Sequence, residues 1–307
     1  LQKMDEDCYD KITFGDDEIG YPHAQGYDNF VEQLSKFFPE ERENIENYCK
    51  EIQRVCNYFP RYNVVAQNNY NPDILHLNTK RFIKSITSNE KLQSVLLGSN
   101  FLYAGDSENT PFYVHALTVN SYIQSAYKCT KGGSQISKLL INKLRKYGAE
   151  VHKHSEVTEF VFSDNNLLSS VKTKDENEYF SKQFISNIEI RSAIKLIGEN
   201  RIKKSFYNRV FSWEPTSSCF SVYLVLKPKS IGSFNYNVYH FLSKDLVWNS
   251  FKYKKEKWPE TYMLSSTSSK HDPEFAESLT AISYMHFTEV KEWENTFNTI
   301  ANQQDRN

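Results

Sequence analysis

Three side chains with the chemistry of metal ligands alternate along one short segment of this 307-residue chain. They are His152, His154 and Glu156. Residues two apart in a β-strand point to the same face, so a strand here would place two imidazoles and a carboxylate side by side. That set is able to bind a transition metal. A solvated strand edge uses the same residue types, and because we favour that interpretation we expect no metal site.

Other reactive side chains have simple structural explanations. His115 could line a substrate channel, but its apolar surroundings in the sequence favour a hydrogen-bonded core histidine. The basic run 252–257, which includes Glu256 and precedes Trp258, would suit a membrane surface, but we favour a solvated turn. No Ser-His-Asp set, pair of carboxylates or phosphate-binding loop stands out. We therefore assign no catalytic residue.

Two consecutive glycines, Gly132 and Gly133, directly precede the pattern of an amphipathic helix. Because glycine has no Cβ, such a pair lets a ligand approach the backbone closely. The alternative is a loop that turns into a helix and binds nothing. The pair alone favours the second interpretation, and only the order of the motifs around it would reverse that.

Apolar residues spaced about 3.6 apart predict several helices. The clearest helix follows Pro39 and ends at Pro60, and its apolar face comprises Ile45, Tyr48, Cys49, Ile52, Val55, Cys56 and Phe59. Other helices are expected from Asp28 to about residue 37 and over 78–86, 88–97 and 112–127. The helix after the glycines should end at Gly148. Its inward face should comprise Ile136, Leu139, Leu140, Ile141 and Leu144.

Beyond Gly148 the period of the apolar residues changes to two, which is typical of strands. We expect strands over 150–154, 157–162, 167–173, 178–185, 219–226, 237–241, 262–265 and 281–287. A helix is expected over 190–196, and a final helix from Thr288 or Glu289. An early strand should surround Ile12 and Phe14. Together these patterns predict a mixed α/β fold.

Bulk composition excludes several classes of protein. The formal net charge of −1 offers no basic surface for nucleic acid. Five scattered cysteines without a CxxC motif favour neither a disulfide framework nor a zinc site. The apolar runs are shorter than the roughly 20 residues of a membrane-spanning helix. We expect a soluble, cytoplasmic protein.

The order of motifs between Lys131 and Asn187 resembles that of the phytoene desaturase, carotenoid isomerase and retinol saturase group of flavin-dependent oxidoreductases. The motifs are the diglycine, the helix end Gly148-Ala149-Glu150-Val151, the strand Val157-Thr158-Glu159-Phe160, and the segment Phe184-Ile185-Ser186-Asn187. In that group the strand valine contacts the adenine of FAD through its backbone, and the Ile-Ser-Asn ends a strand of the FAD fold. The resemblance therefore implies that Gly132, Gly133, Val157 and Asn187 bind FAD.

The resemblance extends over nearly the whole chain but departs from the group at both ends. Met4-Asp5-Glu6-Asp7, Gly26-Tyr27-Asp28-Asn29-Phe30, residues 218–224 and residues 272–276 look like parts of its substrate domain. The GxGxxG turn that begins the group, which lets a pyrophosphate approach a helix N-terminus, has no counterpart here. The Gly-rich segment that closes over the flavin is also missing, and the usual Tyr-Pro before the diglycine reads Thr130-Lys131. We therefore expect the chain to be the central fragment of a longer enzyme.

The resemblance also implies an architecture and a function. Residues 131–200 should form a partial FAD-binding layer, while 1–130 and 201–307 should build a substrate domain with a mixed or antiparallel sheet and covering helices. The whole enzyme would use FAD to desaturate, saturate or isomerise a long apolar polyene by hydride transfer. A substrate that partitions from lipid would bring it into peripheral contact with a membrane. The fragment alone should bind FAD weakly or not at all, and the alternative function is a binding module that has lost its cofactor.

Overall fold

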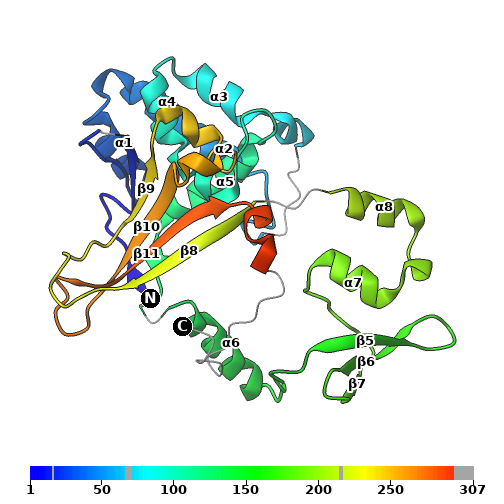
Figure 1. The fold of residues 1–307 in the computed structure, drawn as a ribbon. Coiled ribbons are helices and arrows are strands. Elements are labelled where there is room, and N and C mark those ends of the chain that lie inside the picture. The colour runs from blue at the N-terminus through cyan, green and yellow to red at the C-terminus, as the bar shows by residue number, and fades with distance from the viewer. Residues whose placement is uncertain (16, 66–70, 131, 214–216, 294–307) are drawn as a thin grey trace. The chain divides into compact units, whose positions relative to one another are not determined.

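The chain divides into two compact units. One comprises residues 1–130 and 216–307, and the other comprises residues 131–215. A computed structural model describes residues 1–293 except 16, 66–70, 131 and 214–216 (Figure 1). Helix α8 (Lys204–Ser212) belongs to the second unit, where it packs against α7 (Ile190–Ile197). The division of the chain at residue 200, as expected from the sequence, stays a prediction.

The first unit is built on a six-stranded mixed sheet with the order β3-β2-β9-β10-β11-β8. Its strands are β2 (Asp10–Phe14), β3 (Tyr21–His23), β8 (Ser218–Val225), β9 (Asn237–Phe241), β10 (Thr261–Ser268) and β11 (Ala276–Met285). Strand β2 pairs in parallel with β9, and the remaining neighbours are antiparallel. The sheet therefore joins both parts of the chain that flank the second unit. A mixed α/β fold, predicted from the sequence, is confirmed.

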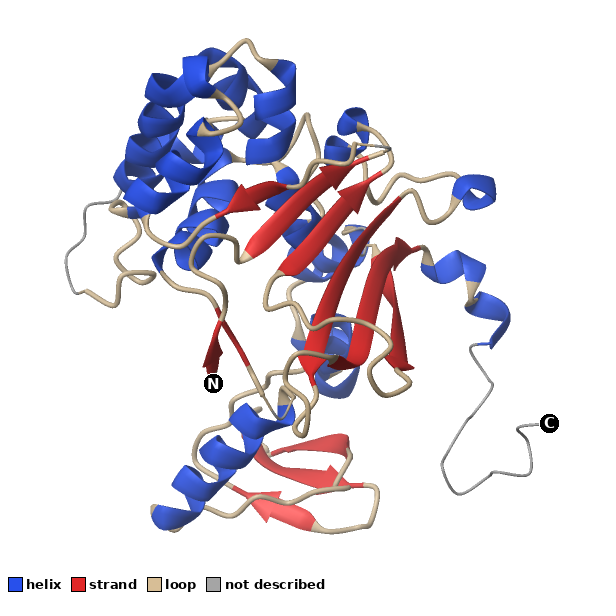
Figure 2. Ribbon diagram, turned by 90° about the vertical axis from the view of Figure 1, so that its left-hand side faces the viewer, coloured by secondary structure: helices blue, strands red, loops and turns tan. Residues whose placement is uncertain are grey.

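Helices cover one face of this sheet (Figure 2). They are α1 (Tyr27–Ser35), α2 (Arg42–Cys56), α3 (Thr79–Ile86), α4 (Glu90–Leu96) and α5 (Phe112–Gln124). All the apolar positions predicted within α2 are buried, and they join the sheet's inner face in one hydrophobic core. Gly98 allows the chain to pack directly against Ile12 of the core. A Cβ at position 98 would lie only 2.4 Å from Cδ1 of Ile12. This contact brings the turn after α4 onto β2.

Three details of these helices differ from the expectation. Gly26, with a φ of 82°, caps α1 in place of Asp28, which lies inside the first turn. Pro39 begins a short 3-10 helix, Pro39–Glu41, and α2 starts only at Arg42. The predicted helix over 112–127 ends at Gln124, because Tyr127–Lys128 forms a short strand, β4, that pairs with β1 (Gln2–Lys3).

The second unit contains α6 (Ser134–Lys146), a three-stranded antiparallel sheet, and the pair α7 and α8. The sheet has the order β5-β6-β7, with β5 at Val157–Phe162, β6 at Leu168–Thr173 and β7 at Glu178–Phe180. The hairpin between β5 and β6 turns at Asn166, whose φ is 59°. A turn was expected at this point, and Asn is one of the residues that tolerate such a conformation.

Several predictions for the second unit are wrong. Residues 150–154 form no strand, and β7 ends at Phe180, so the segment 184–187 is not a strand either. A strand requires a hydrogen-bonded neighbour, and neither segment has one among the described residues. The apolar face of α6 is not turned inward, because Ile136 is 53% exposed and Leu139 62%. The spacing of the apolar residues identified an apolar face of α6, but it does not show whether other parts of the protein cover that face.

The end of the chain is only partly described. The 3-10 turns Phe287–Glu289 and Lys291–Trp293 follow β11 where the final helix was expected to begin. The rest of that predicted helix, from residue 294 onward, lies outside the described residues. In the described part of the chain, no helix is both long enough and apolar enough to cross a membrane.

Candidate functional site

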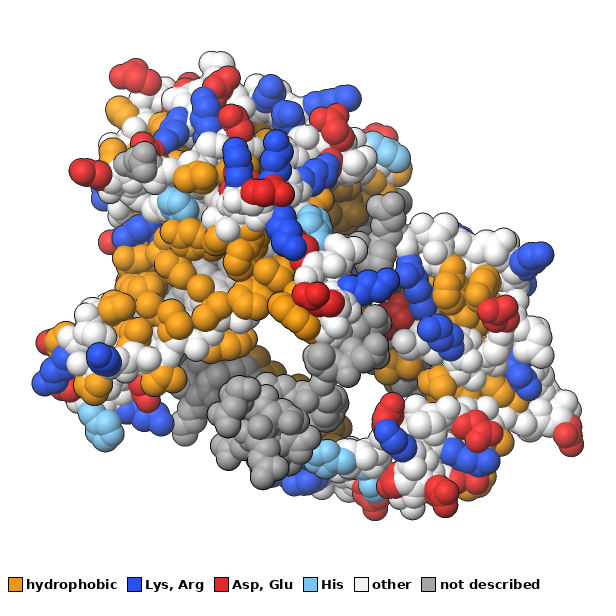
Figure 3. Space-filling model, viewed as in Figure 1, with side chains coloured by type: hydrophobic (Ala, Val, Ile, Leu, Met, Phe, Trp, Pro, Cys, Tyr) orange, Lys and Arg blue, Asp and Glu red, His pale blue; other side chains and the backbone are white. Residues whose placement is uncertain are grey.

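One face of the six-stranded sheet carries helices, and the other presents apolar side chains to the outside over three neighbouring strands. Because side chains alternate along a strand, the paired register places one set of residues on this second face. We call it the open face, and it comprises Phe220 and Val222 of β8, Ala281 and Ser283 of β11, and Tyr262 and Leu264 of β10. Hydrophobic side chains gather over these strands in Figure 3. Phe220 is 41% exposed and Val222 36%.

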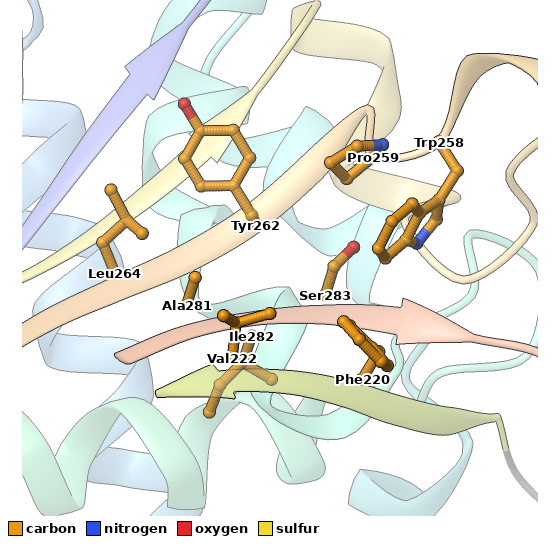
Figure 4. A pocket seen from close by; sticks show the side chains of 9 residues that line it. All are labelled: Phe220, Val222, Trp258, Pro259, Tyr262, Leu264, Ala281, Ile282 and Ser283. Carbon is orange, nitrogen blue, oxygen red and sulfur yellow. The ribbon is translucent and has the colours of Figure 1, made fainter. Parts of the chain in front are cut away.

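A pocket of about 330 Å³ lies on the open face. Its lining adds Trp258, Pro259 and Ile282 to the residues of the open face. Figure 4 shows Phe220 and Trp258 at one end of the pocket and Leu264 at the other. A cavity with nearly all its lining apolar suits a ligand with little polarity, because hydrogen-bonding groups on the ligand would lose their water without finding partners.

Trp258 is fixed by its neighbours rather than free to swing across the pocket. Its indole Nε1 donates a hydrogen bond of 2.7 Å to the carbonyl oxygen of Tyr284. Its ring meets Phe220 edge to face, with 5.7 Å between the ring centroids. The Tyr284 hydroxyl is in turn bound to the carbonyl oxygen of Phe101 in the helical layer. The aromatic end of the pocket is therefore attached to the core.

The open face becomes polar beyond Tyr262. His240 of β9 stacks against the Tyr262 ring at 4.8 Å, and its Nδ1 lies 3.0 Å from the Thr13 hydroxyl of β2. No described residue forms a hydrogen bond with Nε2 of His240. Partial burial lowers the pKa of His240 below its ordinary value, which favours the neutral imidazole. The row Phe220, Ser283, Tyr262, His240 thus crosses the sheet from an apolar end to a polar one.

The glycines predicted to approach FAD lie at the start of α6. Gly132 has a φ of 75°, a conformation that glycine adopts without strain, and Gly133 is the N-cap of the helix. A Cβ added at either glycine would meet no atom within 4 Å. The chain itself therefore does not require glycine at Gly133, and the space beside both residues is open.

Val157 and Asn187, the other two predicted cofactor residues, line one cavity of about 440 Å³ in the second unit. The remaining lining residues are Phe160, Phe162, Leu168, Val171, Phe184, Ile185, Ser186, Ile188 and Ile197. Val157 begins β5, which is an edge strand with one side unpaired. The structure thus brings these two residues to the same cavity, and Gly132 and Gly133 are not part of its lining.

The conceivable metal ligands do not assemble. His152 and His154 lie in a loop instead of a strand, and His154 has a positive φ of 60°. His152 Nε2 lies 3.0 Å from a carboxylate oxygen of Glu150, an exposed pair. No group of three acidic, histidine or cysteine side chains in the described ranges is placed to hold a metal ion.

His115 is a core histidine, as expected. Its Nε2 and Nδ1 each lie 2.7 Å from a tyrosine hydroxyl, that of Tyr48 and that of Tyr103 respectively. Complete burial lowers its pKa to about 3, so the imidazole is neutral at physiological pH. It has no access to the open face, and we assign it a structural role.

The basic run before Trp258 is a solvent-exposed turn. Lys252 pairs with Asp106, and 255–257 form a single 3-10 turn. The sequence pattern did not indicate the pocket beside this turn, although residues 218–224 resemble part of the substrate domain of the flavin-dependent group. The signal available was the alternation of Phe220, Val222 and Leu224, but only the strand register shows which residues of β10 and β11 stand next to them.

Comparison with known proteins gives distant relatives. The chain matches no protein-family model. It is 22% identical over 254 residues to an all-trans-retinol 13,14-reductase of Macaca fascicularis, covering 73% of this chain and 41% of that protein. The same-named protein of Rattus norvegicus is 23% identical over 267 residues, covering 78% of this chain and 44% of the relative. The chain thus spans less than half the length of these curated relatives.

A solved structure shares the fold. A crystal structure of a Pyrococcus furiosus protein superposes with a TM-score of 0.56 at 16% identity, covering 95% of this chain and 64% of that one. At this identity the likeness concerns the fold alone. The sequence relatives support a distant relationship to proteins named all-trans-retinol 13,14-reductase.

Proposed function

We propose that the intact protein is an FAD-dependent oxidoreductase that reduces, desaturates or isomerises carbon–carbon bonds in a long apolar polyene of the retinoid or carotenoid class. The observation that carries this proposal is the apolar pocket on the open face, with Phe220 and Trp258 at one end. The distant relationship to proteins named for the reduction of retinol supports the same substrate class.

The residues available for a flavin fit this cofactor in two ways. Open space beside Gly132 and Gly133 leaves room for a group against the backbone. The unpaired side of β5 at Val157 offers peptide N–H and C=O groups, which are suited to the edge of an adenine, and Asn187 lines the same cavity. We assign these four residues to the cofactor.

In such an enzyme the flavin supplies the redox chemistry, accepting or donating a hydride, and the protein supplies binding and orientation. The open face would hold the polyene in an apolar environment and keep water from it. Trp258, fixed to Tyr284, would define one end of the bound chain. No acid or base of this chain is assigned to the reaction.

Flavin content tests the cofactor assignment. Replacing Gly133→Val in the intact protein should lower the flavin bound per protein, because the branched side chain would occupy the space assigned to the cofactor. The change should leave the melting temperature of the flavin-free protein nearly unaltered, because a Cβ at Gly133 would meet no atom of the chain within 4 Å. Ser137→Val, one turn further along the exposed surface of α6, is the matched control and should retain flavin.

Two results would contradict the proposal. A folded Gly133→Val variant with full flavin content would remove the diglycine from the cofactor site. If the intact wild-type protein holds no flavin after purification or reconstitution, the enzyme proposal fails. A non-catalytic module that binds apolar molecules would then be the better description of the pocket.

A further inference from the structure

The polar end of the open face offers a partner for one polar group on an otherwise apolar ligand. The residues concerned are His240 and Thr13, on neighbouring strands that come from opposite ends of the sequence. Tyr262 belongs to the pocket lining and stacks on His240, so the imidazole lies directly beyond the pocket's β10 side. This inference rests on the proposed function, since it concerns the same pocket.

The hydrogen bonds of His240 leave one ring nitrogen available. Nδ1 is paired with the Thr13 hydroxyl at 3.0 Å, and Thr13 has a second, longer contact of 3.4 Å to the carbonyl oxygen of Tyr239. Thr13 and Tyr262 thus hold the ring from two sides, which fixes its orientation. Nε2 has no hydrogen-bond partner among the described residues, and the imidazole is only partly buried.

The size of the open face matches a chain-like ligand. From β8 to β9 the sheet advances by three inter-strand spacings, or about 14 Å. A molecule lying across the strands along the row Phe220, Ser283 and Tyr262 would bring its far end to His240 of β9. That length is comparable to an extended retinoid.

We propose that Nε2 of His240, oriented by Thr13, forms a hydrogen bond with a terminal hydroxyl group of the apolar substrate. A hydroxyl both donates and accepts, so it fits Nε2 whichever ring nitrogen carries the proton. A carboxylate only accepts and gains most from a cation, which a neutral imidazole does not supply. The site therefore takes an isoprenoid alcohol in preference to the corresponding acid or hydrocarbon.

Binding measurements on the intact protein test this assignment. The probes are all-trans-retinol, the same polyene without its hydroxyl, and all-trans-retinoic acid, followed by the change in retinoid fluorescence on binding. The wild-type protein should bind the alcohol about 3- to 10-fold more tightly than the hydrocarbon, the value of one neutral hydrogen bond. His240→Leu should abolish that preference without weakening the binding of the hydrocarbon.

Two further variants distinguish a specific loss of the hydrogen bond from a general loss of structure. Thr13→Val removes the hydroxyl that orients the imidazole, and it should reduce the preference for the alcohol by a smaller factor. His271→Leu changes an exposed histidine in a loop away from the open face and should behave like the wild-type protein. Circular dichroism of each variant reports whether it is folded.

The outcomes separate this inference from the proposed function. If His240→Leu keeps the wild-type preference for the alcohol, the assignment of His240 is wrong while the pocket stands. Lys11 lies on β2 two residues before Thr13, on the same face of the sheet. If retinoic acid binds most tightly and Lys11→Met removes that preference, the site recognises an anion and the inference is overturned. If the wild-type protein binds none of the three probes, the proposed function fails and this inference fails with it.

Discussion

Asp10 lies in the core and forms no ion pair with any described residue, and this predicts an unusual dependence of stability on pH. The side chain is 1% exposed on the inner face of β2, and its Oδ1 accepts a hydrogen bond of 2.8 Å from Asn237 Nδ2. Burial raises its pKa from the ordinary 3.8 to about 7, against the opposing effect of that hydrogen bond. The folded protein therefore retains a proton on Asp10 over a range in which the unfolded chain releases it.

The sign of the effect follows from proton binding. Between about pH 4 and pH 7 the folded state binds one more proton at Asp10 than the unfolded state, so the free energy of unfolding falls as pH rises through this window. Above pH 7 Asp10 is ionised in both the folded and the unfolded state, and the free energy of unfolding falls no further through this group. A pKa rise of this size corresponds to about 4 kcal/mol, an upper limit because a relaxing structure admits water.

The substitution Asp10→Asn isolates this contribution. Asparagine has the shape of the protonated acid, and its carbonyl oxygen is able to accept the hydrogen bond from Asn237. The variant should match the wild-type protein near pH 4 and exceed its stability increasingly up to pH 7, by about 2–4 kcal/mol at pH 8. Urea denaturation at a series of pH values provides the measurement.

The difference between variant and wild type is the quantity to plot. Two buried histidines, His23 and His115, have pKa values lowered by burial to about 4 and about 3, and their titration makes both proteins more stable as pH rises toward 6.5. These contributions cancel in the difference. Asp245→Asn, at an exposed carboxylate of the same unit, is the control for the removal of one negative charge from the surface. A constant difference for Asp10→Asn would refute the reasoning.

Two further predictions concern the pocket and the uncovered helix. Val222→Arg should abolish binding of apolar ligands without loss of stability. Tyr223→Arg, on the opposite face of the same edge strand and 76% exposed, should leave binding unchanged. If a ligand titration shows equal effects of both substitutions, the ligand binds elsewhere. Ile52→Ala, which empties a fully buried position on α2, should cost about 2–5 kcal/mol in urea denaturation. Ile136→Ala on α6 of the 307-residue chain should change stability by less than about 0.5 kcal/mol, and a large loss would mean that the helix face is covered.

The sequence predicted those elements whose local pattern and partners agree. The apolar face of α2 is buried where the period placed it, and β9 has the predicted bounds. Strand β9 lies between β2 and β10, so its alternation meets partners on both sides. Helix α6 has an equally regular pattern, yet its apolar residues are exposed. Whether such a face is covered depends on distant packing, which a period does not contain.

The candidate site shows the same limit. Val157 and Asn187 come to one cavity although the segment before Asn187 is not a strand, so their joint position does not depend on the expected local structure. The pocket on the open face combines β8, β10 and β11, and His240 meets Thr13 across 227 positions of sequence. No local pattern connects such residues. Only the strand order and register bring them together.

The pairing of β2 with β9 has a consequence for the nascent chain. Asp10 faces Asn237 in the finished sheet, so at about 5–20 residues per second the ribosome releases the second strand roughly 10–45 s after the first. Throughout this interval the edge of β2 that β9 will cover is unpaired, and an unpaired edge is a template for association with other chains. Slow translation lengthens this exposure, and chaperones that bind the early strands would reduce association with other chains. The yield of folded protein thus depends on how the cell protects the first 25 residues until the sheet is able to close.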